Sequence, residues 1–150
     1  MQASAEAVED RLAGHPRAGI PIFACHEGYP GHHLHFAAAA LGASSARRAF
    51  RSDIFVEGWG LYSEKLGEDM GIYRDPWEHF GRLSLEMWRA CRLVIDTGLH
   101  AKLWTRQQAI DYGIQPSEVD RYVVWPGQAC SYKIGELEIL RLRTKAQQAL

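Results

Sequence analysis

Residues 76–100 read PWEHFGRLSLEMWRACRLVIDTGLH, which is the strongest helical pattern in the chain. Apolar side chains recur there at steps of three and four: Phe80, Leu83, Met87, Cys91, Val94 and Ile95. This spacing is typical of one side of a helix. Asp75 and Pro76 form a typical helix start, because aspartate caps free N–H groups and proline suits the first turn. The stretch therefore predicts a long helix from about Pro76 to His100.

The segments on either side also predict helices. Helical patterns cover residues 34–41, 53–66 and 128–150, and shorter helices are expected after Thr105 and from Ser117. Two prolines and two glycines predict a loop over residues 14–21. No stretch alternates between apolar and polar residues as a half-buried strand does. We therefore expect a mainly α fold and a single domain over residues 1–150.

The composition excludes several classes of protein. The 150 residues are 47% hydrophobic and 23% charged, with a formal charge of −1. This balance lacks the basic footprint of a nucleic-acid-binding protein, and no apolar run is long enough to cross a membrane. Residues 1–10 lack the pattern of a signal peptide, and the three scattered cysteines do not make a disulfide framework. We expect a cytoplasmic protein without nucleic-acid or membrane partners.

Histidine is the unusual component, since four of the seven histidines fall between positions 26 and 35. His26 and Glu27 form half of the HExxH signature, in which two histidines one helical turn apart bind zinc and the glutamate is the general base. The fourth residue after His26 is Pro30. On a straight helix His32 and His33 would lie about 9 and 10.5 Å further along the axis, too far to share a metal ion.

Pro30 and Gly31 indicate how the histidines could still meet. Proline lacks an N–H group, and glycine adopts backbone angles that other residues avoid. If these two residues form a bulge, their removal restores the order of HExxH, with His32 as the second ligand and His33 as the alternative. The competing interpretation is a histidine-rich helix start without a metal.

The segment FVEGWGLYSE, residues 55–64, contains the best candidate for a third ligand. Glu57 has apolar neighbours that predict burial, and a buried carboxylate needs a cation or protons. Glu64 follows seven residues later on the same side of a helix, where it could orient a ligating imidazole by accepting its other ring N–H. The alternative is that both carboxylates lie on the solvated side of an amphipathic helix.

Four motifs occur in order: HEGYPGHHLH, FVEGWGLYSE, RLVIDTGLH and WPGQACSYKIGELEI. Over about residues 22–142 the chain resembles the bacterial domain of unknown function 885 family. This family is generally grouped with HExxH metallopeptidases whose third zinc ligand is a glutamate. The resemblance implies a helical, metallopeptidase-like catalytic domain with a Pro-Gly insertion in its HExxH-type helix.

The same motifs are distantly similar to oligopeptidases of the thimet type, in which HEFGH is followed by a segment beginning FVE. When the FVE segments are aligned, this chain is two residues longer between the HE pair and the glutamate, and Pro30 and Gly31 account for the surplus. The resemblance implies three ligands of Zn²⁺ or another divalent metal, a general base and a tyrosine that stabilises the oxyanion. The implied ligands are His26, His32 and Glu57. The implied general base is Glu27, and the implied tyrosine is Tyr132.

Arg92, Asp96 and His100 are spaced four apart on the long predicted helix. Such a series is commonly a solvated stripe of charges. The family resemblance implies a second interpretation, in which Asp96 holds His100 and Arg92 binds a substrate carboxylate or the oxyanion. Both interpretations stay open at this point.

The leading hypothesis is a zinc-dependent hydrolase of a peptide or a small amide. Zinc would lower the pKa of its bound water, and Glu27 would take the proton and pass it to the leaving amine. Members of the family usually carry a long helical portion before the HE motif, where this chain has 25 residues. The alternative is therefore a non-catalytic metal-binding or protein-interaction module, in which a partner chain or a second copy completes the cleft.

Overall fold

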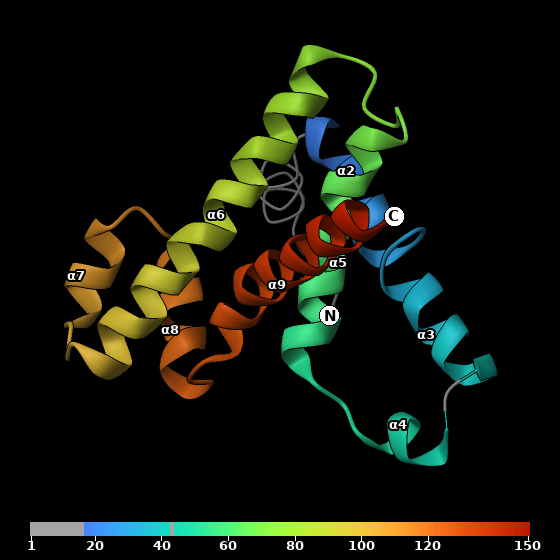
Figure 1. The fold of residues 1–150 in the computed structure, drawn as a ribbon. Helices are drawn as coiled ribbons and strands as arrows, with labels where there is room; N and C mark the ends of the chain where they lie inside the picture. The colour runs from blue at the N-terminus through green and yellow to red at the C-terminus, as the bar shows by residue number, and fades with distance from the viewer. Residues whose placement is uncertain (1–16, 43) are drawn as a thin grey trace, which may run out of the picture.

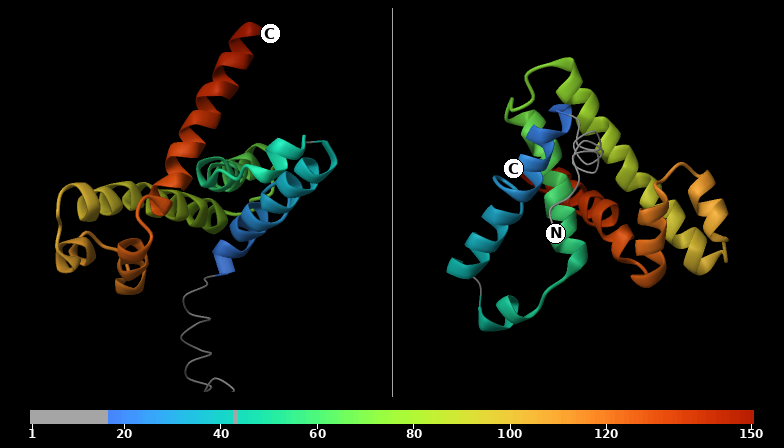
Figure 2. Two further views of the ribbon diagram at one scale, coloured as in Figure 1. Left: turned by 90° about the horizontal axis from the view of Figure 1, so that it is seen from below. Right: turned by 180° about the vertical axis from the view of Figure 1, so that it is seen from behind.

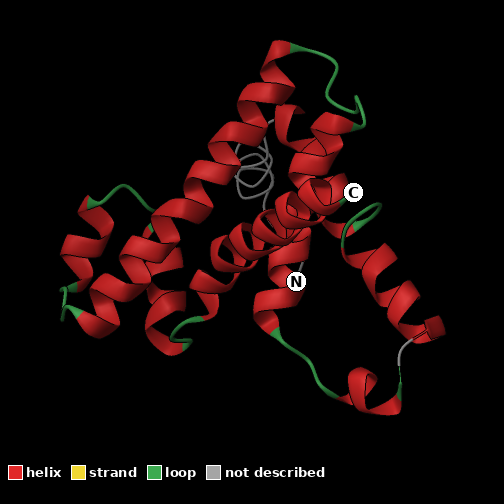
Figure 3. Cartoon of the chain, viewed as in Figure 1, coloured by secondary structure: helices red, strands yellow, loops and turns green. Residues whose placement is uncertain are grey.

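The computed structural model describes residues 17–42 and 44–150, which form helices joined by turns and contain no strand (Figure 3). The mainly α prediction is therefore confirmed. The elements in chain order are η1 (Arg17–Gly19), α2 (Ile20–Glu27), α3 (His32–Gly42), α4 (Ser45–Ala49), α5 (Asp53–Asp69), α6 (Pro76–Ala101), α7 (Arg106–Asp111), α8 (Pro116–Val124) and α9 (Gln128–Ala149). Among the described helices, none combines the length and apolar character that crossing a membrane requires.

One predicted loop is helical instead. A loop was expected over residues 14–21. Residues 17–19 form a short 3-10 helix, and residues 20 and 21 begin α2. Residues 14–16 lie outside the described residues. Pro21 lies in the first turn of α2, where its missing N–H group has no partner to lose.

Helix α6 begins as the sequence predicts, since the Asp75 side chain accepts hydrogen bonds from the backbone N–H groups of Trp77 and Glu78 at 2.8 and 2.9 Å. Its apolar stripe, however, is largely exposed, with Phe80, Leu83 and Met87 each more than half accessible. The buried residues of α6 are mostly polar, and they include Arg82, Arg89, Arg92 and Asp96. Helix α6 thus places charged groups inside the fold.

Helices α5 and α9 cross at the centre of the molecule (Figure 1) and share the most extensive contact among the described elements. Gly58 and Gly135 lie at the crossing. A Cβ atom on Gly135 would lie 2.0 Å from the carbonyl oxygen of Ile54, and one on Gly58 would lie 2.4 Å from the Gly135 Cα. The backbones can approach this closely only because both residues are glycine.

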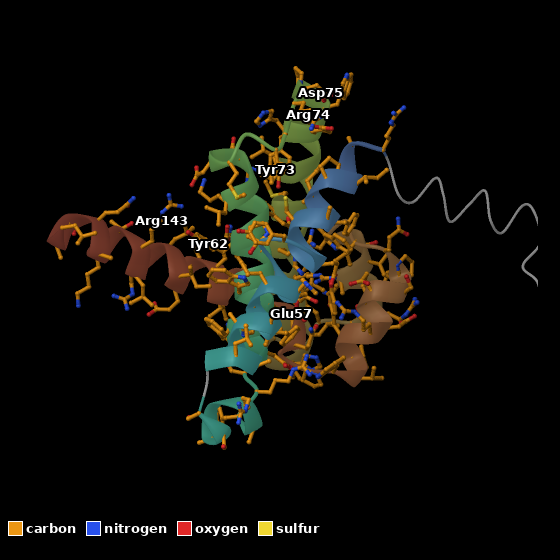
Figure 4. All side chains as sticks on the ribbon, turned by 90° about the vertical axis from the view of Figure 1, so that its right-hand side faces the viewer. Glu57, Tyr62, Tyr73, Arg74, Asp75 and Arg143 are labelled. Carbon is orange, nitrogen blue, oxygen red and sulfur yellow. The ribbon has the colours of Figure 1, made fainter. Side chains whose placement is uncertain are left out.

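Beyond the crossing, α9 extends away from the other helices (Figure 2). Arg143 fixes its second half to α5, because its guanidinium donates to the Tyr62 hydroxyl at 3.2 Å and to Asp69 at 2.8 Å. Tyr62 and Arg143 lie next to each other in Figure 4. This contact joins α9 to α5 beyond the glycine crossing.

Helices α7 and α8 pack at the C-terminal end of α6 around an apolar core that consists of Ile95, Ala109, Ile114, Val119, Tyr122 and Ala129. The chain then turns into α9 through Gly127, whose φ of 82° is in the left-handed region that favours glycine. The N–H of Gly127 donates to both carboxylate oxygens of Asp96 at 3.1 Å. Asp96 thereby fixes the start of α9 against α6.

Candidate metal centre

The chain between the two motif histidines is broken, as a shared metal would require. Helix α2 ends at Glu27 and α3 begins at His32, so the HE pair ends a helix and does not start one. The interruption spans residues 28–31, twice the length of the expected bulge. A Cβ on Gly31 would lie 1.9 Å from the His26 carbonyl oxygen, so only glycine lets the chain fold back here.

Helix α5 holds this turn in place. The indole N–H of Trp59 donates to the Pro30 carbonyl oxygen at 2.9 Å, and the Ser63 hydroxyl, which donates to the Trp59 carbonyl oxygen at 2.7 Å, lies 3.4 Å from the same Pro30 oxygen. Gly60 faces both imidazoles, since a Cβ there would lie 2.6 Å from Nε2 of His26 and 2.9 Å from Cε1 of His32. The missing side chain at position 60 leaves the space that the two rings occupy.

The three predicted ligands converge on one point. The ring centroids of His26 and His32 are 4.7 Å apart. The Oε2 atom of Glu57 lies 3.7 Å from Nε2 of His26 and 3.5 Å from Nε2 of His32. Glu57 projects from α5 near the middle of the molecule (Figure 4). Tetrahedral zinc with bonds of about 2.1 Å holds its ligand atoms about 3.4 Å apart, and both distances from Glu57 to the imidazoles are close to that spacing.

His26 is oriented from behind by a buried carboxylate. Its Nδ1 lies 2.7 Å from Oε1 of Glu64, and Glu64 is only 1% exposed. An ionised carboxylate only accepts hydrogen bonds, so Nδ1 carries the hydrogen and Nε2 presents a lone pair towards Glu57 and His32. Nη2 of Arg89, at 3.1 Å from the same Glu64 oxygen, compensates the buried charge.

Sequence reasoning singled out Glu64 but missed Arg89. One signal was available in the sequence: Arg89 lies off the apolar stripe of the longest predicted helix. It also lies three residues before the start of the family motif RLVIDTGLH. Many exposed arginines share that pattern, so burial of Arg89 becomes evident only when α6 is packed against α5.

The charges of the site favour a cation. Burial alone would raise the pKa of Glu57, but the adjacent imidazoles of His26 and His32 outweigh it and lower the pKa to about 2. For His26, burial alone would lower the pKa, while contacts with Glu57 and Glu64 raise it above its usual value. Positive charge is therefore stabilised where the three donors meet, which is the position that a divalent metal would take.

Glu27 lies at the open edge of this group. One of its carboxylate oxygens and one nitrogen from each of His26 and His32 lie within 4.8 Å of one another, and Glu27 itself is exposed to solvent. His33, the alternative ligand, is also exposed and does not belong to that group among the described residues. The structure thus places His32, and not His33, beside His26.

Tyr132 reaches the centre from α9. Its ring is stacked near that of His26, with the centroids 6.2 Å apart. The guanidinium of Arg92 lies over the Tyr132 ring at 4.7 Å and pairs with Glu118 at 2.9 Å. Arg92 is only 5% exposed, and its guanidinium is already engaged by Glu118 and the Tyr132 ring. It is therefore not open to a substrate carboxylate in this structure.

Asp96 and His100 do not form the contact that the sequence allowed. Asp96 accepts from the backbone of Gly127, and the Nε2 atom of His100 lies 3.0 Å from the Tyr122 carbonyl oxygen. Each residue instead has its own partner: Asp96 contacts the start of α9, and His100 contacts α8. Both residues therefore fix the helices around Tyr132 and lie outside the group of candidate metal ligands.

An apolar groove of about 1030 Å³ opens between α3, α4 and the start of α5. Phe36, Phe55 and Trp59 are among its lining residues. The Phe36 ring also lies 6.0 Å from that of His32, between centroids, so the groove borders the candidate metal ligands.

The comparisons with known proteins establish the family. The family model described as "Bacterial protein of unknown function (DUF885)" matches residues 2–150, so the chain belongs to this family. No curated protein matches the sequence closely enough to count as a relative.

Two solved structures share the fold. A "putative lipoprotein" from Colwellia psychrerythraea is 44% identical with a TM-score of 0.84, and the match covers 89% of this chain and 25% of that one. A "putative lipoprotein of unknown function" from Shewanella oneidensis is 24% identical with a TM-score of 0.88, and the match covers 99% of this chain and 29% of that one. The chain therefore spans between a quarter and a third of the length of either relative.

These relatives contradict the expected cytoplasmic location. Both are described as lipoproteins, a class that a covalently attached lipid anchors at a membrane. The expectation rested on residues 1–10 and three scattered cysteines of a chain that covers only 25% and 29% of the two relatives. They were therefore poor evidence for where a protein of this family resides.

Proposed function

We propose that this chain carries the site of a zinc-dependent hydrolase that cleaves peptide or related amide bonds. The observation that carries the proposal is the approach of Oε2 of Glu57 to Nε2 of both His26 and His32, at 3.7 and 3.5 Å. Two imidazoles and one carboxylate are a common ligand set of catalytic zinc, in which the fourth position stays open.

The chemistry then divides among the surrounding side chains. Bound zinc would act as a Lewis acid that makes water acidic and polarises the scissile carbonyl group. Glu27, exposed at the edge of the site, would accept the proton of the attacking water and deliver it to the leaving amine. The hydroxyl of Tyr132 would donate a hydrogen bond to the developing oxyanion.

Glu27→Gln tests this division of roles. The amide cannot accept the proton, so we expect hydrolysis of a peptide library to fall about 10²- to 10⁴-fold while one zinc per chain remains after dialysis. Glu138→Gln, on the exposed side of α9, is the matched control and should change neither quantity. A fully active Glu27→Gln variant, or a wild-type chain that takes up no zinc, would overturn the proposal.

A non-catalytic interaction module is the second candidate. The exposed stripe of Phe80, Leu83 and Met87 on α6 favours it, because contiguous apolar surface commonly marks a binding site. The same measurement separates the two candidates. A chain that binds zinc but shows no hydrolysis in the wild type, across the whole peptide library, would support the module.

A further inference from the structure

Gln128, the first residue of α9, is 8% exposed and its amide meets side chains from three other positions in the fold. Nη1 of Arg121 donates to its Oε1 at 3.1 Å. Its Nε2 lies 3.3 Å from the Tyr132 hydroxyl oxygen and 3.5 Å from Oε1 of Glu57. A buried amide with partners on both sides is held in one orientation.

The guanidinium of Arg121 decides which way the amide faces. Arginine has only donors, so the amide oxygen must point towards Arg121 and the NH₂ group towards Glu57 and Tyr132. Arg121 is held in turn by Glu118, whose Oε2 lies 3.1 Å from Nη2 of Arg121 and 2.9 Å from Nη2 of Arg92. The orientation of Gln128 is therefore set by a chain of contacts that begins on α8.

The two carboxylate oxygens of Glu57 have different partners. Oε2 faces the imidazoles of His26 and His32, whereas Oε1 accepts from Gln128. An oxygen that already accepts a hydrogen bond competes poorly for a metal, so this arrangement favours binding through Oε2 alone. The second amide hydrogen goes to the Tyr132 oxygen, which leaves the hydroxyl proton of Tyr132 available for donation.

We propose that Gln128 is a positioning residue of the metal centre: it restricts Glu57 to one-oxygen ligation and aligns the Tyr132 hydroxyl as a donor. This inference rests on the proposed hydrolase function. In this proposal the Gln128 amide connects the proposed metal ligand Glu57, on α5, with the proposed oxyanion donor Tyr132, on α9.

Gln128→Leu removes both donors at similar size. We expect zinc affinity, measured by competition with a chelator, to fall about 10- to 100-fold. The visible spectrum of the cobalt-loaded chain should change, because Glu57 is then free to bind through both oxygens. The turnover number kcat should fall more than KM changes, since the Tyr132 donor acts on the transition state. Gln107→Leu on α7, which removes an exposed amide, should leave all three readouts as in the wild type.

The outcomes separate this inference from the proposed function. A wild-type chain that binds no zinc overturns the proposed function. A wild type that binds zinc, with an unchanged cobalt spectrum and zinc affinity in Gln128→Leu, overturns the inference alone. If circular dichroism shows that Gln128→Leu does not fold, Arg121→Leu replaces it, because loss of the Arg121 donor frees the amide to rotate. Changes in the same direction support the proposal, and unchanged readouts overturn it.

Discussion

Both ring nitrogens of His26 face a carboxylate: Glu64 at Nδ1 and Glu57 at Nε2. The two contacts have different consequences. Glu64 is fully buried and compensated by Arg89, so its charge is fixed in the fold, whereas Glu57 is partly accessible. A metal that binds between Nε2 and Glu57 therefore gains a ligand whose ring is already oriented.

Glu64→Gln measures what that orientation contributes. The amide of glutamine carries no charge to hold the Nδ1 hydrogen of His26, so we expect zinc affinity to fall about 10- to 100-fold in competition with a chelator. Glu68→Gln, one turn further along α5 and more exposed, is the matched control. Equal zinc affinity in Glu64→Gln and in the wild type would contradict this role for Glu64.

At this scale, the sequence predicted the residues whose relation is local. Glu57 and Glu64 share one side of a helix because they are seven residues apart, and Pro30 with Gly31 predicted a break before His32. Gln128 was not predicted, because 71 residues separate it from Glu57. That contact exists only after α5 and α9 cross, and the crossing has no periodic signal in the sequence.

Between elements, the packing of α5 on α9 is the most extensive contact that the structure describes, and it depends on two glycines. Gly135→Ala would place a methyl group 2.0 Å from the Ile54 carbonyl oxygen, which backbone atoms cannot easily avoid. We expect a loss of about 1–3 kcal/mol or more in the free energy of unfolding, measured by chemical denaturation.

Gly42→Ala is the matched control, since a Cβ there meets nothing within 4 Å. Its free energy of unfolding should stay close to that of the wild type. Equal stability of Gly135→Ala and Gly42→Ala would show that the helices can separate without cost.

The position and extent of the longer helices were predictable, while the buried side of α6 was not. Capping by Asp75 and the apolar spacing located α6, but the exposed Phe80 and Met87 and the buried Arg89 reverse the usual preference. Buried arginines are stable there because carboxylates from α5, α6 and α8 pair with them, and no local pattern records such pairing.

For the whole molecule, these ion pairs make stability depend on pH. Burial alone would raise the pKa of Glu118, but the guanidinium groups of Arg92 and Arg121 outweigh it and lower the pKa below its usual 4.5. A carboxyl group whose pKa is lowered by folding stabilises the folded state above the unfolded pKa. This contribution is lost as the pH falls through the folded-state value.

Glu118→Gln should therefore have a lower Tm than the wild type at pH 7. The difference in Tm should shrink as the pH falls below 4.5, because the wild-type carboxylate is then protonated as well. Thermal unfolding followed by circular dichroism between pH 3 and pH 7 gives both curves. A difference in Tm that stays constant over this range would show that the charge of Glu118 is not responsible.

Fold class was the most predictable property at the largest scale, because helical periodicity is repeated over most of the chain. Cellular location was the least predictable. The relatives described as lipoproteins are three to four times as long as the stretch that matches them, so most of each relative has no counterpart in the sequence from which location was predicted.

The glycine crossing also bears on how this chain can vary. Glu57 adjoins Gly58, and Tyr132 lies one turn before Gly135, so the separation of ligand and donor is fixed by backbone atoms in direct contact. The side chain that lies between the two groups is Gln128, whose amide contacts both. Positions 58 and 135 thus hold the two backbones that carry the ligand and the donor at one separation.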